Sequence, residues 1–134
     1  MSPISPSAPR TWRLSLAREV EREILVMTVA GRLGTVSSGD LIEALVQAID
    51  EGRRRILCDL GGVDYASSAG LLAFDALSGR MHQAGGRLVL CSLTEPVRLV
   101  FDLAGLLPHF TVEPTREAGI RRLADATPGG RALP

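Results

Sequence analysis

Two short stretches of the chain are almost entirely apolar, and they constrain the fold more than any other feature of the sequence. Residues 55–60 read RILCDL and residues 87–92 read RLVLCS. Strands with little alternation between apolar and polar side chains are typical of a sheet buried on both faces, and such sheets are mostly parallel. A helical pattern follows each stretch and supplies the crossover that parallel strands need. We therefore expect an α/β fold.

The remaining periodicities divide the chain into alternating strands and helices. Strands are expected at residues 12–18, 24–30, 55–60, 87–92 and 110–112. Helices are expected at residues 38–51, 68–84, 95–104 and 115–126. Residues 37–40 supply N-cap candidates for the first helix, and the polar segment 19–23 predicts an edge hairpin between the first two strands. The expected fold class is α/β, a mixed β-sheet of about five strands covered by about four helices.

The length of 134 residues is typical of one domain. Residues 1–10 repeat Pro and Ser without periodicity, which predicts a flexible N-terminal tail. The folded domain is expected at residues 11–126, with a flexible C-terminal tail at 127–134.

Charge and hydropathy exclude several classes of partner. Fifteen basic side chains balance fifteen acidic ones, so the chain lacks the positive field that nucleic-acid binding requires. No stretch approaches eighteen uninterrupted apolar residues, and the N-terminus lacks the apolar core of a secretory signal. We expect a cytoplasmic protein that does not insert into a membrane.

Residue types that carry catalytic or metal chemistry are sparse. Cys58 and Cys91 fall within expected strands and are interpreted as buried, reduced core residues, with a disulfide between neighbouring strands as the less favoured alternative. His82 and His109 are the only histidines and no CxxC motif is present, so neither a metal nor a cofactor is expected. Gly85-Gly86 follows a helix rather than a strand, which excludes a dinucleotide fingerprint. With no nucleophile elbow or triad order either, we expect no enzyme.

The turn after residues 55–60 contains two adjacent hydroxyl side chains, Ser67 and Ser68. An apolar strand, a polar turn and a helix start place both serines where free backbone N–H groups gather, at the positive end of the helix dipole. Such a position suits a capping hydroxyl and also tolerates a phosphate. Asp59, expected within the strand, and Asp64, expected in the following loop, flank the turn and are interpreted as solvated or locally capping residues.

Four motifs in this order resemble the STAS family, in particular the bacterial anti-sigma-factor antagonists. They are the segment Gly31-Arg32-Leu33-Gly34 before the first helix, the turn Ser67-Ser68-Ala69-Gly70-Leu71, the strand after Gly85-Gly86, and the helix containing Val97, Phe101 and Gly105-Leu106. The resemblance covers roughly residues 12 to 124. It implies a partner-binding surface formed by Gly34, Thr35, Ser67, Ser68, Ala69 and Leu72.

The motifs depart from the family pattern at two positions. Ala69 occupies the usual phosphoacceptor position and has no hydroxyl, so the resemblance leaves Ser68 as the first candidate acceptor and Ser67 as the second. Gly34 stands where the family carries an acidic residue, which removes one negative charge from the neighbourhood of the turn and makes a phosphate easier to accommodate.

The resemblance implies a switch that is not itself an enzyme. An unphosphorylated antagonist binds an anti-sigma factor that is also a serine kinase, phosphorylation at the turn breaks that complex, and a PP2C-type phosphatase resets it. Ala69 and Gly34 keep a second function open: a STAS scaffold that is not phosphorylated, or the small cytoplasmic subunit of a lipid transport ATPase.

Overall fold

The computed structural model of the protein describes residues 14–125. The tails expected at residues 1–10 and 127–134 lie outside the described residues, as do the two ends of the domain expected at 11–126. Within residues 14–125, no helix is both long enough and apolar enough to cross a membrane.

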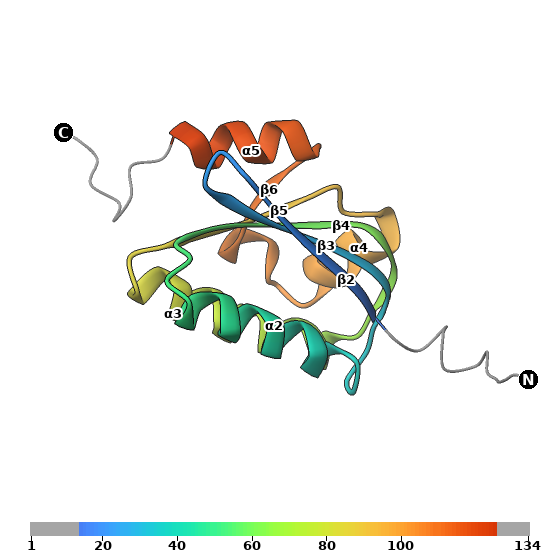
Figure 1. Cartoon of the computed structure of the whole chain (residues 1–134). Helices are drawn as coiled ribbons and strands as arrows, with labels where there is room; N and C mark the ends of the chain where they lie inside the picture. The colour runs from blue at the N-terminus through green and yellow to red at the C-terminus, as the bar shows by residue number, and fades with distance from the viewer. Residues whose placement is uncertain (1–13, 126–134) are drawn as a thin grey trace, which may run out of the picture.

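The described chain alternates strands and helices around one mixed sheet (Figure 1). The strands are β2 (Leu14–Glu21), β3 (Ile24–Leu33), β4 (Arg55–Ala66), β5 (Arg87–Cys91) and β6 (Thr111–Glu113). The helices are α2 (Ser38–Asp50), α3 (Ser68–Gln83), α4 (Glu95–Leu103) and α5 (Arg116–Asp125), with a 3-10 turn η1 (Leu107–His109). The strand order is β2-β3-β4-β5-β6; β2 is antiparallel to β3 and every other pair is parallel. The expected fold class is confirmed.

Helices cover both faces of the sheet, which explains the apolar central strands. α2, α3 and α4 pack on one face and α5 packs on the other (Figure 1). Along β3, Leu25 and Met27 belong to the larger core on the first face, whereas Ile24 and Val26 pack under α5. Because successive side chains of a strand point to opposite faces, a strand covered on both sides is apolar at every position.

The edge hairpin forms with a tighter turn than expected. β2 runs to Glu21 and β3 begins at Ile24, so Arg22 and Glu23 alone form the loop, with φ of 54° and 65°. Positive φ at both loop residues is the type I′ geometry, whose twist matches that of the flanking strands. Residues 19–21, which were expected to belong to the turn, therefore extend β2 instead. This strand lies at the edge of the sheet, where exposed side chains are tolerated.

The expectation that β4 ends at residue 60 is wrong, because the strand continues to Ala66. Asp64, expected in a loop, is an exposed strand residue. Gly61-Gly62 has the composition of a turn, yet a Cβ on Gly62 would lie 2.7 Å from the Ala30 Cβ. The glycine is there because β3 and β4 approach closely where their register shifts.

Cys58 and Cys91 are free and fully buried, as expected. Desolvation raises the pKa of Cys91 from its ordinary 9.0 to about 11. Desolvation, with smaller contributions from Cys91 and Asp59, raises the pKa of the Cys58 thiol still further. Neither thiol is therefore a nucleophile at neutral pH, because the thiolate is the reactive form.

Replacing Phe101 with Ala should lower the free energy of unfolding by about 3–5 kcal/mol. Phe101 is completely buried and its ring meets the Phe110 ring edge-on, with centroids 5.4 Å apart. Urea denaturation followed by circular dichroism measures the change. Leu103→Ala on the same helix is the matched control: Leu103 is 78% exposed, so the change should stay below about 1 kcal/mol. Equal losses in the two variants would contradict this description of the core.

Candidate functional site

The junction between β4 and α3 holds both candidate serines. Ser67 occupies the N-cap of α3: its backbone is extended and its Oγ accepts a hydrogen bond from the Gly70 amide at 3.2 Å. Its own amide donates to the Leu33 carbonyl at 2.9 Å. Ser67 is thus half-buried and held on both sides, as the capping interpretation predicted.

Ser68 is the first residue of α3 and is exposed. Within residues 14–125, its hydroxyl has no hydrogen-bond partner, and the backbone amides of Ser68 and Ala69 have none either. These amides belong to the first turn of a 16-residue helix, where N–H groups lack carbonyl partners and the dipole favours negative charge. The geometry therefore presents a free hydroxyl beside two free N–H donors.

The loop between β3 and α2 lies directly against this turn. Leu33, the last residue of β3, pairs with Ala66, the last residue of β4. A Cβ on Gly70 would lie 3.3 Å from the Gly34 carbonyl oxygen and 3.3 Å from the Ser38 Cβ. Glycine thus lets α3 approach the loop without an intervening side chain, and the predicted partner-binding residues of the two loops lie at one end of the sheet.

Ser37 holds that loop in shape instead of capping α2. It occupies the N-cap position of α2 but makes no side-chain cap, which corrects its interpretation as a capping candidate. Its Oγ accepts a hydrogen bond from the Gly34 amide at 2.9 Å and donates to the Arg32 carbonyl at 2.6 Å. The two hydrogen bonds direct the hydroxyl into the loop, away from the free amides of the helix start.

Exposed apolar side chains gather in the segments that form the junction. Leu72, one helical turn after Ser68, is 57% exposed, and Val36 in the facing loop is 91% exposed. Tyr65 is 42% exposed, with the Arg32 guanidinium 4.2 Å from its ring centre. Leu72 was predicted from the sequence, whereas Val36 and Tyr65 were missed. A branched apolar residue inside the polar segment 34–38 is the signal that would have pointed to Val36.

Of the two aspartates that flank the turn, Asp64 is exposed and Asp59 makes local contacts. The Asp59 carboxylate accepts a hydrogen bond from the Gly61 amide at 2.9 Å and lies 4.0 Å from the Arg116 Nε. Among residues 14–125 there is no group of three or more His, Cys, Asp or Glu side chains that could hold a metal ion.

Replacing Gly70 with Val should lower the free energy of unfolding by about 1–3 kcal/mol, because the new side chain would push against the Leu33 and Gly34 backbone. Urea denaturation measures the loss. Gly79→Val is the matched control on the same helix: nothing lies within 4 Å of its added Cβ, so stability should change by less than about 0.5 kcal/mol. Loss of stability in the control alone would contradict the close approach of α3 to the loop.

The sequence of this chain matches a known protein family and named relatives. The family described as the STAS domain matches residues 15–119. BtrV of Bordetella bronchiseptica, named as a candidate anti-sigma factor antagonist, is 36% identical over 105 residues, covering 78% of this chain and 90% of that protein. The anti-sigma-B factor antagonist of Bacillus subtilis is 30% identical over 104 residues, covering 78% and 94%.

A solved structure has the same fold. The crystal structure of an anti-sigma factor antagonist from Mycobacterium paratuberculosis superposes with a TM-score of 0.76 at 20% sequence identity, covering 84% of this chain and 95% of that one. At this identity the match shows the fold alone. With the family match over most of the described chain and two relatives at 30% identity or more, the chain belongs to the STAS domain family.

Proposed function

We propose that this chain is an anti-sigma factor antagonist, a binding protein that docks an anti-sigma factor through the β4–α3 junction. The serine-turn surface is defined as Gly34, Thr35, Val36, Ser67, Ser68, Ala69 and Leu72. The observation that carries the proposal is an exposed serine at a helix start, with exposed Leu72 one turn along the helix and Val36 in the facing loop. Both relatives described above are named as antagonists of this kind.

The serine-turn surface has the chemistry of a protein-docking site. Val36 and Leu72 are more than half exposed, and burying such side chains contributes about 1.5–3 kcal/mol each. Exposed apolar side chains that gather among polar ones are typical of protein interaction sites. The proposed role needs binding alone, so the chain is proposed to act without catalysis, in the cytoplasm.

Regulation is proposed to occur by phosphorylation of Ser68 by an anti-sigma factor that is also a serine kinase. Ser68 is favoured because its hydroxyl is exposed and unpaired within the described chain, whereas the Ser67 Oγ already accepts the Gly70 amide. A phosphate on Ser68 would lie beside the free amides of the first helical turn, which stabilise it in the unbound chain. Ala69, at the usual acceptor position, does not block this route.

The same phosphate is expected to oppose binding. It would place close to two negative charges beside Val36 and Leu72, where a partner would otherwise bury apolar surface. An unpaired charge within an interface costs several kcal/mol, enough to weaken binding by orders of magnitude. A PP2C-type phosphatase is proposed to remove the phosphate and restore binding.

Incubation with the cognate anti-sigma kinase, ATP and Mg²⁺ should add one phosphate, measured by intact mass spectrometry and mapped by peptide sequencing. Ser68→Ala should abolish the added mass, whereas Ser78→Ala, on the same helix ten residues later, should leave it unchanged. Ser68→Glu should weaken kinase binding at least tenfold. Tight binding of the kinase without any added phosphate would instead support the unphosphorylated scaffold. Neither binding nor phosphate would favour the subunit of a lipid transport ATPase.

Leu72→Ala should weaken binding of the anti-sigma factor about tenfold or more, because a central apolar contact is removed. Calorimetric titration measures the dissociation constant. Leu103→Ala removes the same side chain from a position on α4 that is 78% exposed, against 57% for Leu72, and should leave affinity unchanged. A stronger effect at Leu103 than at Leu72 would move the proposed docking surface to α4.

A further inference from the structure

A cation and an aromatic ring lie together just before the two loops of the serine-turn surface. Arg32 is the second-last residue of β3 and Tyr65 is the second-last residue of β4, and the two are paired across the strands. The Arg32 guanidinium carbon lies over the Tyr65 ring, 4.2 Å from its centre, which is a cation–π contact. Both residues are exposed. The carboxyl ends of β3 and β4 therefore present an open, positively charged pair.

The backbone holds this pair beside the serine turn. The Arg32 carbonyl accepts a hydrogen bond from the Ser37 hydroxyl at 2.6 Å, which closes the loop that presents Val36. Tyr65 precedes Ser67 by two residues, so their Cα atoms are at most about 7 Å apart. The Arg32–Tyr65 pair is thus continuous with the serine-turn surface.

The Arg32 guanidinium has no acidic partner within residues 14–125. Neither Asp64, the neighbour of Tyr65 in the chain, nor any other described carboxylate forms an ion pair with it. The adjacent loop, residues 34–37, carries no charged side chain. The charge of Arg32 is therefore available to a group that comes from outside the described chain.

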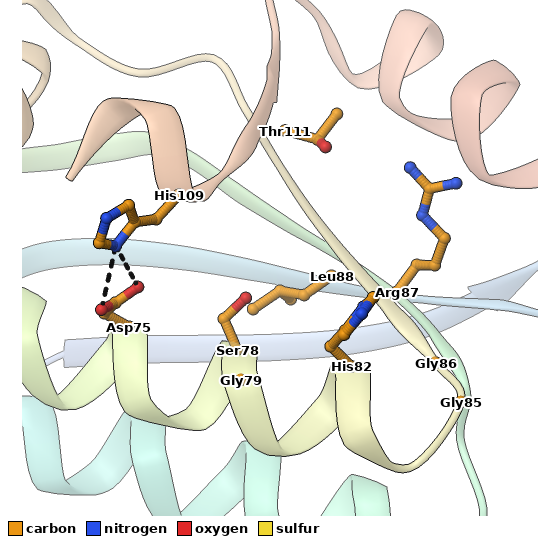
Figure 2. Close-up of a pocket in the computed structure, with 10 residues that line it drawn as sticks. All are labelled: Asp75, Ser78, Gly79, His82, Gly85, Gly86, Arg87, Leu88, His109 and Thr111. Atoms are coloured by element: carbon orange, nitrogen blue, oxygen red, sulfur yellow. Dashed lines mark hydrogen bonds and ion pairs between the residues drawn. The ribbon is translucent and has the colours of Figure 1, made fainter. Parts of the chain in front are cut away.

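The charged groups further along α3 are arranged differently. In the groove between that helix and η1, the Asp75 carboxylate faces the His109 ring, whose Nδ1 lies 3.1 Å from it (Figure 2). The carboxylate in that groove is thus occupied from within the chain. The open charge lies instead beside the start of α3, next to the surface proposed to dock a partner.

Stacking on the ring prepares the guanidinium to bind a carboxylate. Its flat face lies over the ring, so the N–H donors, which lie in its plane, point outward around its edge. A carboxylate accepts two such donors in parallel, and the contact with the ring can persist while it does so. The ring also restricts the arginine side chain before binding, which reduces the conformational entropy lost in the complex. Arg and Tyr are among the residues that contribute most to protein interfaces.

We propose that Arg32 and Tyr65 extend the serine-turn surface and bind an Asp or Glu side chain of the anti-sigma factor. This inference rests on the proposed function, because the partner is the protein that docks at the serine turn. The carboxylate accepts two hydrogen bonds from the edge of the Arg32 guanidinium, and an apolar neighbour on the partner packs against the Tyr65 ring. A partner with a basic side chain at this point is disfavoured, so the pair contributes specificity as well as affinity.

Calorimetric titration of the anti-sigma factor into Arg32→Gln tests the contact. At about 50 mM salt the dissociation constant should rise about tenfold, and the rise should be smaller at about 500 mM, because salt screens the ion pair. Arg98→Gln, the same change on an exposed arginine of α4, should leave the dissociation constant unchanged. Equal dissociation constants for wild type and Arg32→Gln would overturn this inference and leave docking at the serine turn intact. Absence of wild-type binding would overturn both.

Variants of Tyr65 test the role of the ring. Tyr65→Phe keeps a ring under the guanidinium and should bind like wild type, whereas Tyr65→Leu should weaken binding about threefold. Circular dichroism reports whether each variant is folded. Arg32→Lys, which keeps the charge without the planar fork and should weaken binding about threefold, replaces Arg32→Gln if that variant is not folded. Stronger weakening by Tyr65→Phe than by Tyr65→Leu would contradict the stacking role.

An alanine scan of the Asp and Glu residues of the anti-sigma factor identifies the other half of the contact. One of these changes should weaken binding to wild type about tenfold and have little further effect on binding to Arg32→Gln, because both changes remove the same interaction. If every acidic substitution weakened binding to the two chains equally, the carboxylate contact would be ruled out.

Discussion

The parallel pairing of β3 with β4 at their carboxyl ends is the interaction on which the serine-turn surface depends. Leu33 lies opposite Ala66, and the Ser67 amide donates a hydrogen bond to the Leu33 carbonyl. Because parallel strands end at the same edge of a sheet, the loops that follow them meet there. Gly70 completes the approach, since any side chain at that position would contact the Gly34 backbone.

The start of α3 supports a helix cap and a phosphate site for one physical reason. A helix begins with N–H groups that have no carbonyl partners, and its dipole places partial positive charge there. Ser67 satisfies one of these groups and the amides of Ser68 and Ala69 remain. In the proposed switch, a phosphate on Ser68 would be stabilised in the free chain and opposed in a complex that buries its apolar neighbours. That difference between two states is what a switch requires.

The two ends of α3 present chemically different surfaces. The N-terminal turn presents a hydroxyl among exposed apolar side chains, as a protein partner requires. Further along, the helix contributes Asp75, Ser78 and His82 to a polar groove, where the His109 ring lies 3.1 Å from the Asp75 carboxylate. The sheet core fixes both, because buried residues such as Leu71 and Phe74 lock the helix against the strands and leave its other residues to face outward.

The order and type of the elements followed from the sequence alone, because apolar periodicity records which faces are buried. The cap at Ser67 could likewise be inferred from local pattern, whereas Leu72 entered the expected partner-binding surface through the family resemblance. The extension of β4 to Ala66 could not, because Gly61-Gly62 has the composition of a turn and serves the close approach of β3. Val36 and the groove between α3 and His109 were also hidden. They depend on which loops and helices become neighbours, and contacts between distant segments exist only after the sheet has assembled.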